Sequence, residues 1–68
     1  MAERDDGYLE FEDVVCIGET AKAIFVVIEK DRHWIPQSQV HDDSEVYKNG
    51  TRGTLVISQW IAQARGLA

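Results

Sequence analysis

The sequence predicts a mainly β fold: a small curled antiparallel sheet, or SH3-like partial barrel, of four or five strands with one short C-terminal helix. Most apolar runs are short and rich in β-branched residues, as strands are. One run is apolar on both faces, which favours a curled sheet over a flat one with a wet face. Helical spacing of apolar residues occurs only at the C-terminus. We expect a flexible acidic N-terminus at 1–7 and a single small domain at 8–68.

The first strand is predicted over residues 8–17. Leu9 and Phe11 alternate with acidic residues, which gives the period of two expected of a strand. Asp13 interrupts this alternation before a second apolar run, so we expect a bulge or a sharp bend there. Residues 18–20 should form the following turn.

The second strand, over residues 21–29, carries the strongest β signal in the chain. Its two faces consist, in alternation, of Ile24, Val26 and Ile28 and of Ala23, Phe25 and Val27. Because both faces are apolar, we expect this strand to be central and covered on both sides.

The third strand should return antiparallel over 33–35, after a polar hairpin connection at 30–32. Pro36 should end it, because proline has no N–H for a ladder. Residues 37–40 suggest one helical turn or an irregular bend, and 41–45 a polar loop whose side chains bond nearby amides.

The last strand is predicted over 54–57, after a brief apolar contact at 46–47 and a turn at 49–53. A helix of about two turns should follow, with Ser58 as its N-cap and Gly66 at its end. The helical spacing is carried by Trp60, Ile61, Ala64 and Leu67. Such a short helix is unstable alone, so we expect Trp60 and Ile61 to dock onto the sheet.

Twelve acidic residues outnumber seven basic ones, and seven of the acids lie within the first 19 residues. This balance argues against nonspecific binding of nucleic acid, which relies on cations that neutralise phosphates. It is compatible with simple solubility or with an acidic face that meets a basic partner. The candidate acidic face comprises Glu10, Glu12, Asp13, Asp42, Asp43 and Glu45.

Cys16 is the lone cysteine, so no internal disulfide is possible, and its apolar neighbours predict a small buried hydrophobe. No apolar run approaches the roughly 18 residues of a membrane helix. The acidic N-terminus is unlike a secretory signal. These observations favour the cytoplasm.

Candidate catalytic and metal-binding residues are few. His33 and His41 are the only imidazoles, and Asp42 and Asp43 beside His41 make a poor chelate because neighbouring side chains on an extended chain diverge. The histidines could pair on paper with Ser38 or Ser44, yet no oxyanion site or orienting group accompanies them. We therefore expect no enzymatic activity, no metal and no cofactor.

Two tryptophans are many for so short a chain, and Trp and Tyr are enriched at interfaces. We expect Trp60 in the core, whereas Trp34 can lie in the core or at the surface. The candidate aromatic patch comprises Trp34, Pro36, Gln37 and Ser38. An alternative is binding of single-stranded nucleic acid through an aromatic and basic patch, which would comprise Trp34, Lys30, Arg32, Lys48 and Arg52. A homodimer that pairs through a strand edge is a third possibility.

Residues 20–67 resemble a set of short uncharacterised phage and prophage proteins. The most specific piece is Trp34-Ile35-Pro36-x-Ser38, followed by the acidic loop and by Trp60. The resemblance implies a small accessory factor that binds a host or phage protein, of the size and charge typical of inhibitors of bacterial defence, including anti-CRISPR proteins. We therefore expect a non-enzymatic protein-interaction module of this phage type.

Overall fold

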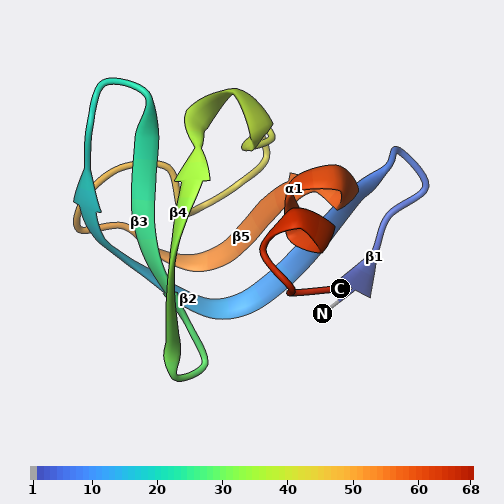
Figure 1. Ribbon diagram of the computed structural model, residues 1–68, viewed down its shortest axis with the longest axis horizontal. Coiled ribbons are helices and arrows are strands. Elements are labelled where there is room, and N and C mark those ends of the chain that lie inside the picture. The colour runs from blue at the N-terminus through green and yellow to red at the C-terminus, as the bar shows by residue number, and fades with distance from the viewer. Residues whose placement is uncertain (1) are drawn as a thin grey trace.

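The computed structural model describes residues 2–68 and shows an unclosed antiparallel sheet with one short C-terminal helix, which confirms the predicted fold class (Figure 1). The elements are β1 (Ala2–Glu3), β2 (Tyr8–Glu19), β3 (Ala23–Ile28), β4 (Asp31–Pro36), the 3-10 helix η1 (Gln37–Gln39), β5 (Arg52–Ser58) and α1 (Gln59–Ala64).

Strand β2 organises the sheet. Glu10 lies opposite Ala2 of β1 and Val56 of β5, so these two strands flank the first half of β2. Val15 lies opposite Val27 of β3 and Arg52 of β5, so β3 replaces β1 along the second half. Strand β4 then pairs only with β3, and it forms a free edge of the curled sheet.

The bend predicted at Asp13 is present. Asp13 has a positive φ of 56°, and the register between β2 and β5 shifts between Phe11 and Val14. Aspartate and asparagine tolerate this backbone region better than most other residues do. A second irregularity, between Cys16 and Gly18, leaves Ile17 outside the register and 46% exposed. Together they let one strand serve both halves of the sheet.

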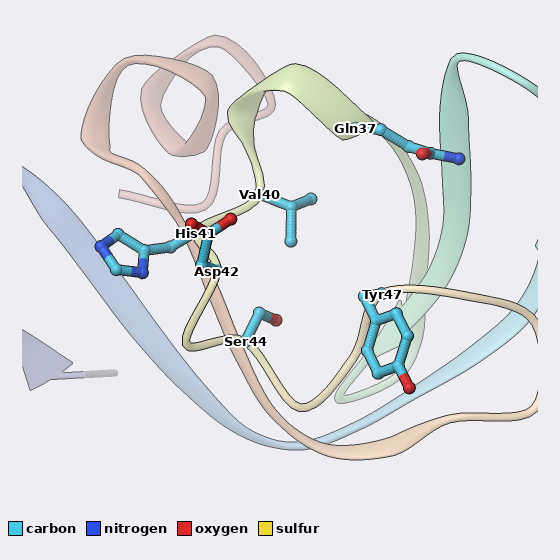
Figure 2. Close-up of a pocket in the computed structure, with 6 residues that line it drawn as sticks. All are labelled: Gln37, Val40, His41, Asp42, Ser44 and Tyr47. Carbon is cyan, nitrogen blue, oxygen red and sulfur yellow. The ribbon is translucent and has the colours of Figure 1, made fainter.

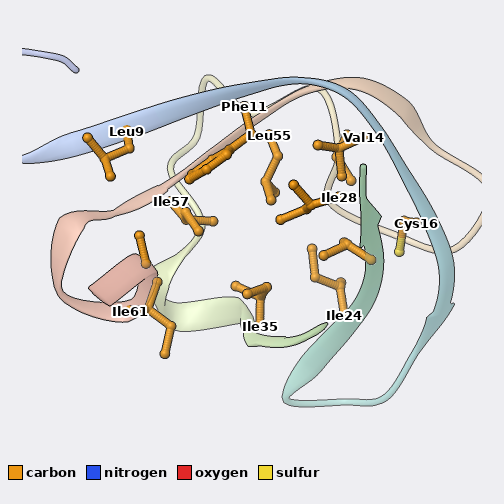
Figure 3. Close-up of a cluster of buried hydrophobic side chains, with 13 residues drawn as sticks. Leu9, Phe11, Val14, Cys16, Ile24, Ile28, Ile35, Leu55, Ile57 and Ile61 are labelled. Atoms are coloured by element: carbon orange, nitrogen blue, oxygen red, sulfur yellow. The ribbon is translucent and has the colours of Figure 1, made fainter. Parts of the chain in front are cut away.

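The core lies between the two halves of the sheet, and Figure 3 shows its side chains converging from β2 and β5 on one side and from β3 and β4 on the other. Its members alternate along the strands with outward-facing residues, as the period of two requires. Fully buried members include Val14, Ile24, Ile35, Leu55 and Ile57, and Cys16 is also buried, as expected.

A segment after η1 covers the outer edge of β5. Val40 bridges Ile57, and the His41 N–H donates to Val56 O at 2.9 Å. Where the segment leaves the extended path, side chains replace backbone acceptors: Ser44 Oγ accepts the Val56 N–H at 3.1 Å, and Glu45 Oε1 accepts the Thr54 N–H at 2.9 Å. Backbone N–H and C=O groups on this edge of β5 are thereby hydrogen-bonded without a regular neighbouring strand.

Helix α1 begins at Ser58, whose Oγ accepts the Ile61 N–H at 3.2 Å, as predicted for the N-cap. It ends in a Schellman arrangement, in which the Leu67 N–H donates to Ala62 O at 2.8 Å and Gly66 has a φ of 74°. Ile61 and Ala62 are buried against the sheet. Within residues 2–68, no helix is long and apolar enough to cross a membrane.

The free edge of β4 is partly occupied. Arg65, at the end of α1, donates from Nε to the Trp34 carbonyl at 2.9 Å. Pro36 has no N–H to offer a further strand. Blocking of this kind is typical of edges that avoid pairing with another chain.

Two expectations about the N-terminal half differ from the structure. Residues 2–7 do not simply fray: Ala2–Glu3 forms β1, and the Arg4 N–H donates to Tyr8 O at 2.9 Å, because β2 leaves an edge open there. The turn after β2 comes later than 18–20. Glu19 still pairs with Ile24, and Thr20 Oγ1 accepts the Ala23 N–H at 3.1 Å to form the turn.

Three further expectations are corrected. The hairpin connection is shorter than 30–32, because Glu29 takes a φ of 58° and Asp31 already pairs with Ile28. The second face of β3 lacks the cover expected of a central strand. Trp60 lies outside the core and is 66% exposed, because only Ile61 and Ala62 of α1 face inward.

Candidate functional site

On β3, on β4, on the second half of β2 and at the start of β5, the side of the sheet that points away from the core forms the candidate site, and we call this part of the sheet the outer face. Ala23, Phe25 and Val27 alternate with the buried residues of β3 and remain half-buried, because α1 lies elsewhere and no second layer covers them. The outer face consists of Val15, Ile17, Ala23, Phe25, Val27, Arg32, Trp34, Pro36 and Arg52.

An aromatic pair lies on the part of the outer face that β3 and β4 form. Phe25 and Trp34 lie directly opposite each other on β3 and β4. Their rings stack with centroids 4.5 Å apart and an interplanar angle of 26°. Trp34 remains 46% exposed. One ring face therefore rests on Phe25, and the side chain keeps surface free for a partner.

A row of side chains crosses the outer face beside this pair. The strand register places Arg32, Val27, Val15 and Arg52 in line across β4, β3, β2 and β5. Three strand spacings of roughly 4.8 Å give a path of about 14 Å along the curved sheet between the backbones at the two ends. Both arginines are exposed, and neither pairs with a carboxylate among residues 2–68.

The acidic residues gather elsewhere, around Arg4. Its guanidinium lies 3.0 Å from Asp6, 3.4 Å from Glu10 and 3.1 Å from Asp43. The hydrogen bond to Asp43, followed by the charges of Asp6, Asp43 and Glu10, raises the pKa of Arg4 despite a partial loss of hydration. Part of the predicted acidic face is thus a local network that joins β1, β2 and the 41–45 loop.

The remaining residues of the predicted acidic face have different environments. Glu12, Asp13 and Asp42 are exposed. Glu45 is also exposed, but its carboxylate accepts the Thr54 N–H. The structure therefore separates the acids, which lie mainly near β1 and the first half of β2, from the aromatic residues of the outer face.

Within the predicted aromatic patch, Trp34 and Pro36 lie on the outer face, opposite Phe25 and Ala23. Gln37 is held at its margin, because its Nε2 donates to Thr20 O at 2.9 Å. Ser38 is exposed on η1.

Among the residues of the predicted basic patch, Arg32 and Arg52 share the outer face. Lys30 lies in the turn between β3 and β4, and Lys48 lies in the loop before β5, with its Nζ 5.5 Å from the centre of the Tyr47 ring.

An open hollow of about 310 Å³ lies beside the 40–47 segment. Figure 2 shows the Ser44 hydroxyl near its floor, Val40 and Tyr47 at its sides, and the His41 ring turned away toward β2. Ser44 Oγ already donates to Val46 O at 2.7 Å, and His41 Nδ1 accepts the Asp43 N–H at 2.9 Å. The Ser44 hydroxyl and His41 Nδ1 are therefore hydrogen-bonded to backbone atoms rather than to each other. No cluster of potential metal ligands occurs in the described part of the chain.

No family model, curated protein or solved structure matches this chain. The candidate site therefore rests on its own geometry.

Sequence reasoning missed Phe25, Val27, Val15 and Ile17 as surface residues. The signal was present, because residues 21–29 are apolar on both faces and a small domain buries a smaller fraction of its surface than a large one. An apolar face that the fold cannot cover is a candidate interaction surface.

Proposed function

We propose that this chain is a non-enzymatic protein-interaction module, an accessory or inhibitor protein of the phage type that its sequence resembles, acting in the host cytoplasm. The observation that supports this is the outer face, with Trp34 stacked on Phe25 and still 46% exposed. Tryptophan is among the side chains most enriched in residues that dominate binding energy.

Replacing Trp34 by alanine should reduce capture of the partner about thirtyfold, because truncating a tryptophan that dominates an interface removes about 2 kcal/mol of binding free energy. The measurement is quantitative mass spectrometry of proteins that cross-link to the tagged chain in a bacterial host. Trp60→Ala is the matched control, because Trp60 is more exposed but lies on α1. The same proteins cross-linking equally to all three chains would contradict the proposal, provided that circular dichroism shows all three folded.

The acidic residues enter this proposal as a separate surface that supplies solubility and steers the approach of a partner. Reversing Glu12 and Asp42, which are exposed and form no salt bridge with Arg4, is a direct comparison. An effect as large as that of Trp34→Ala would transfer the binding role to the acids, which would then imitate a nucleic acid.

A second candidate function is binding of single-stranded nucleic acid, favoured by Arg32, which lies beside Trp34 on β4, and by Arg52 at the other end of the row. Stacking on an aromatic ring and neutralisation of phosphates are the two interactions that such binding uses. If this function is the correct one, a fluorescein-labelled oligothymidine should raise its anisotropy with the chain at about 50 mM salt and lose affinity steeply as salt rises. Absence of binding at low salt, where attraction to phosphate is greatest, would eliminate it.

A further inference from the structure

We propose that the outer face binds a peptide segment whose apolar centre is flanked on both sides by acidic residues. This inference rests on the proposed function and specifies the partner's chemistry. It starts from the cross-strand row Arg32, Val27, Val15 and Arg52, in which two cations enclose an aliphatic strip.

The positive charge of the outer face favours an acidic partner. The chain carries a net charge of −5, yet the outer face has two arginines and no acidic side chain. Arginine presents a planar fork of donors that matches a carboxylate in two parallel hydrogen bonds. Neither guanidinium has a carboxylate partner within residues 2–68. A basic segment would meet like charges here, whereas an acidic one would fill both positions.

The area of the outer face favours a peptide segment over a second copy of the chain as the binding partner. Four strands at roughly 4.8 Å spacing and about five residues of strand length give a footprint of about 14 by 17 Å. A stable protein dimer needs roughly 800 Å² of buried surface from each partner, well above this footprint. Two copies would also bring the arginines of one outer face against the equally acid-free face of the other.

The aliphatic content favours a peptide over a nucleic acid. A single strand of nucleic acid is held by several stacking rings along a basic groove, but Trp34 is the one exposed ring on the outer face. Valine, isoleucine and proline side chains fill the remainder and suit apolar side chains.

The test begins with a random peptide library displayed on yeast. Binders to the wild-type chain are selected and then depleted on Trp34→Ala, so that only peptides that use the outer face remain. We expect their consensus to place acidic residues on both sides of an apolar centre. A consensus without acids, or with basic flanks, would overturn the inference while leaving the proposed function intact.

The second step measures affinity by fluorescence anisotropy with one selected peptide. The double variant Arg32→Glu with Arg52→Glu should weaken binding about tenfold, because two surface attractions become repulsions. Lys22→Glu with Lys48→Glu is the matched control, since it changes the net charge equally at residues off the row, and it should weaken binding less than threefold. Equal losses in the two double variants would show a general charge effect and refute the specific role of the row.

Two further outcomes distinguish failure of this inference from failure of the proposed function. If no peptide depends on Trp34 but a fluorescein-labelled oligothymidine binds and is sensitive to Trp34→Ala, the outer face is a nucleic-acid site and the inference is wrong. If neither probe depends on Trp34, both the inference and the proposed function are wrong.

Discussion

Replacing Ser44 by alanine should lower the free energy of unfolding by about 2–3 kcal/mol, one of the two largest stability losses we expect. Ser44 is only 7% exposed, and its Oγ accepts the N–H groups of Val56 at 3.1 Å and Val46 at 3.3 Å. Alanine leaves both buried N–H groups without this acceptor, and each such group costs about 1–3 kcal/mol. A domain of this size has a total stability on the order of 3–5 kcal/mol, so most of it would be lost.

Urea unfolding followed by circular dichroism measures this effect. Ser38→Ala is the matched control, because it deletes the same hydroxyl from an exposed position on η1 and should change stability by less than about 0.5 kcal/mol. Equal unfolding midpoints for the two variants would show that the Ser44 hydroxyl does not stabilise the packing of the 40–46 segment against β5.

Replacing Gly53 by alanine should destabilise the fold by about 2–4 kcal/mol, through backbone strain and overpacking together. Gly53 has a φ of 139°, and an added Cβ would lie 2.6 Å from Glu45 Oε1 and 3.2 Å from Glu45 Cβ. The carboxylate cannot simply withdraw, because it accepts the Thr54 N–H at 2.9 Å.

Gly50→Ala separates strain from collision, since Gly50 has a φ of 91° but no atom within 4 Å of the added Cβ. It should cost only the strain, about 1 kcal/mol. Adding Glu45→Ala to Gly53→Ala should cost less than the sum of the two single changes, because the collision disappears. Strict additivity in thermal unfolding would contradict this account.

Much of the fold follows from local patterns in the sequence. Alternation predicts β2 and β3, the interruption at Asp13 predicts the bend, and Ser58 with Gly66 predicts the limits of α1. The roles of Ser44 and Glu45 were beyond such reasoning. Their partners lie twelve and nine residues away on β5, and only the folded path of the 40–46 segment brings them together.

The candidate site was predictable only in part. Composition pointed to Trp34 and Pro36, and the basic residues Arg32 and Arg52 were grouped with Trp34 as an alternative. Their alignment depends on the register of four strands, and a shift by one residue would turn Arg32 to the other side of the sheet. Trp60 was wrongly expected in the core, because helical spacing shows which residues share one side of a helix but not which side faces inward.

The pairing of Tyr8 with Ser58 joins nearly the first and the last strand residues of the sheet. During synthesis, β2 can form its hairpin with β3 as soon as both have left the ribosome, but its other edge must wait for β5. The order of chain growth therefore delays completion of the interior until β5 has been synthesised, and its pairing with β2 must close a long loop. Removal of the last 17 residues, beginning at Arg52, would leave β2 and β3 without the strand on which their common interior depends.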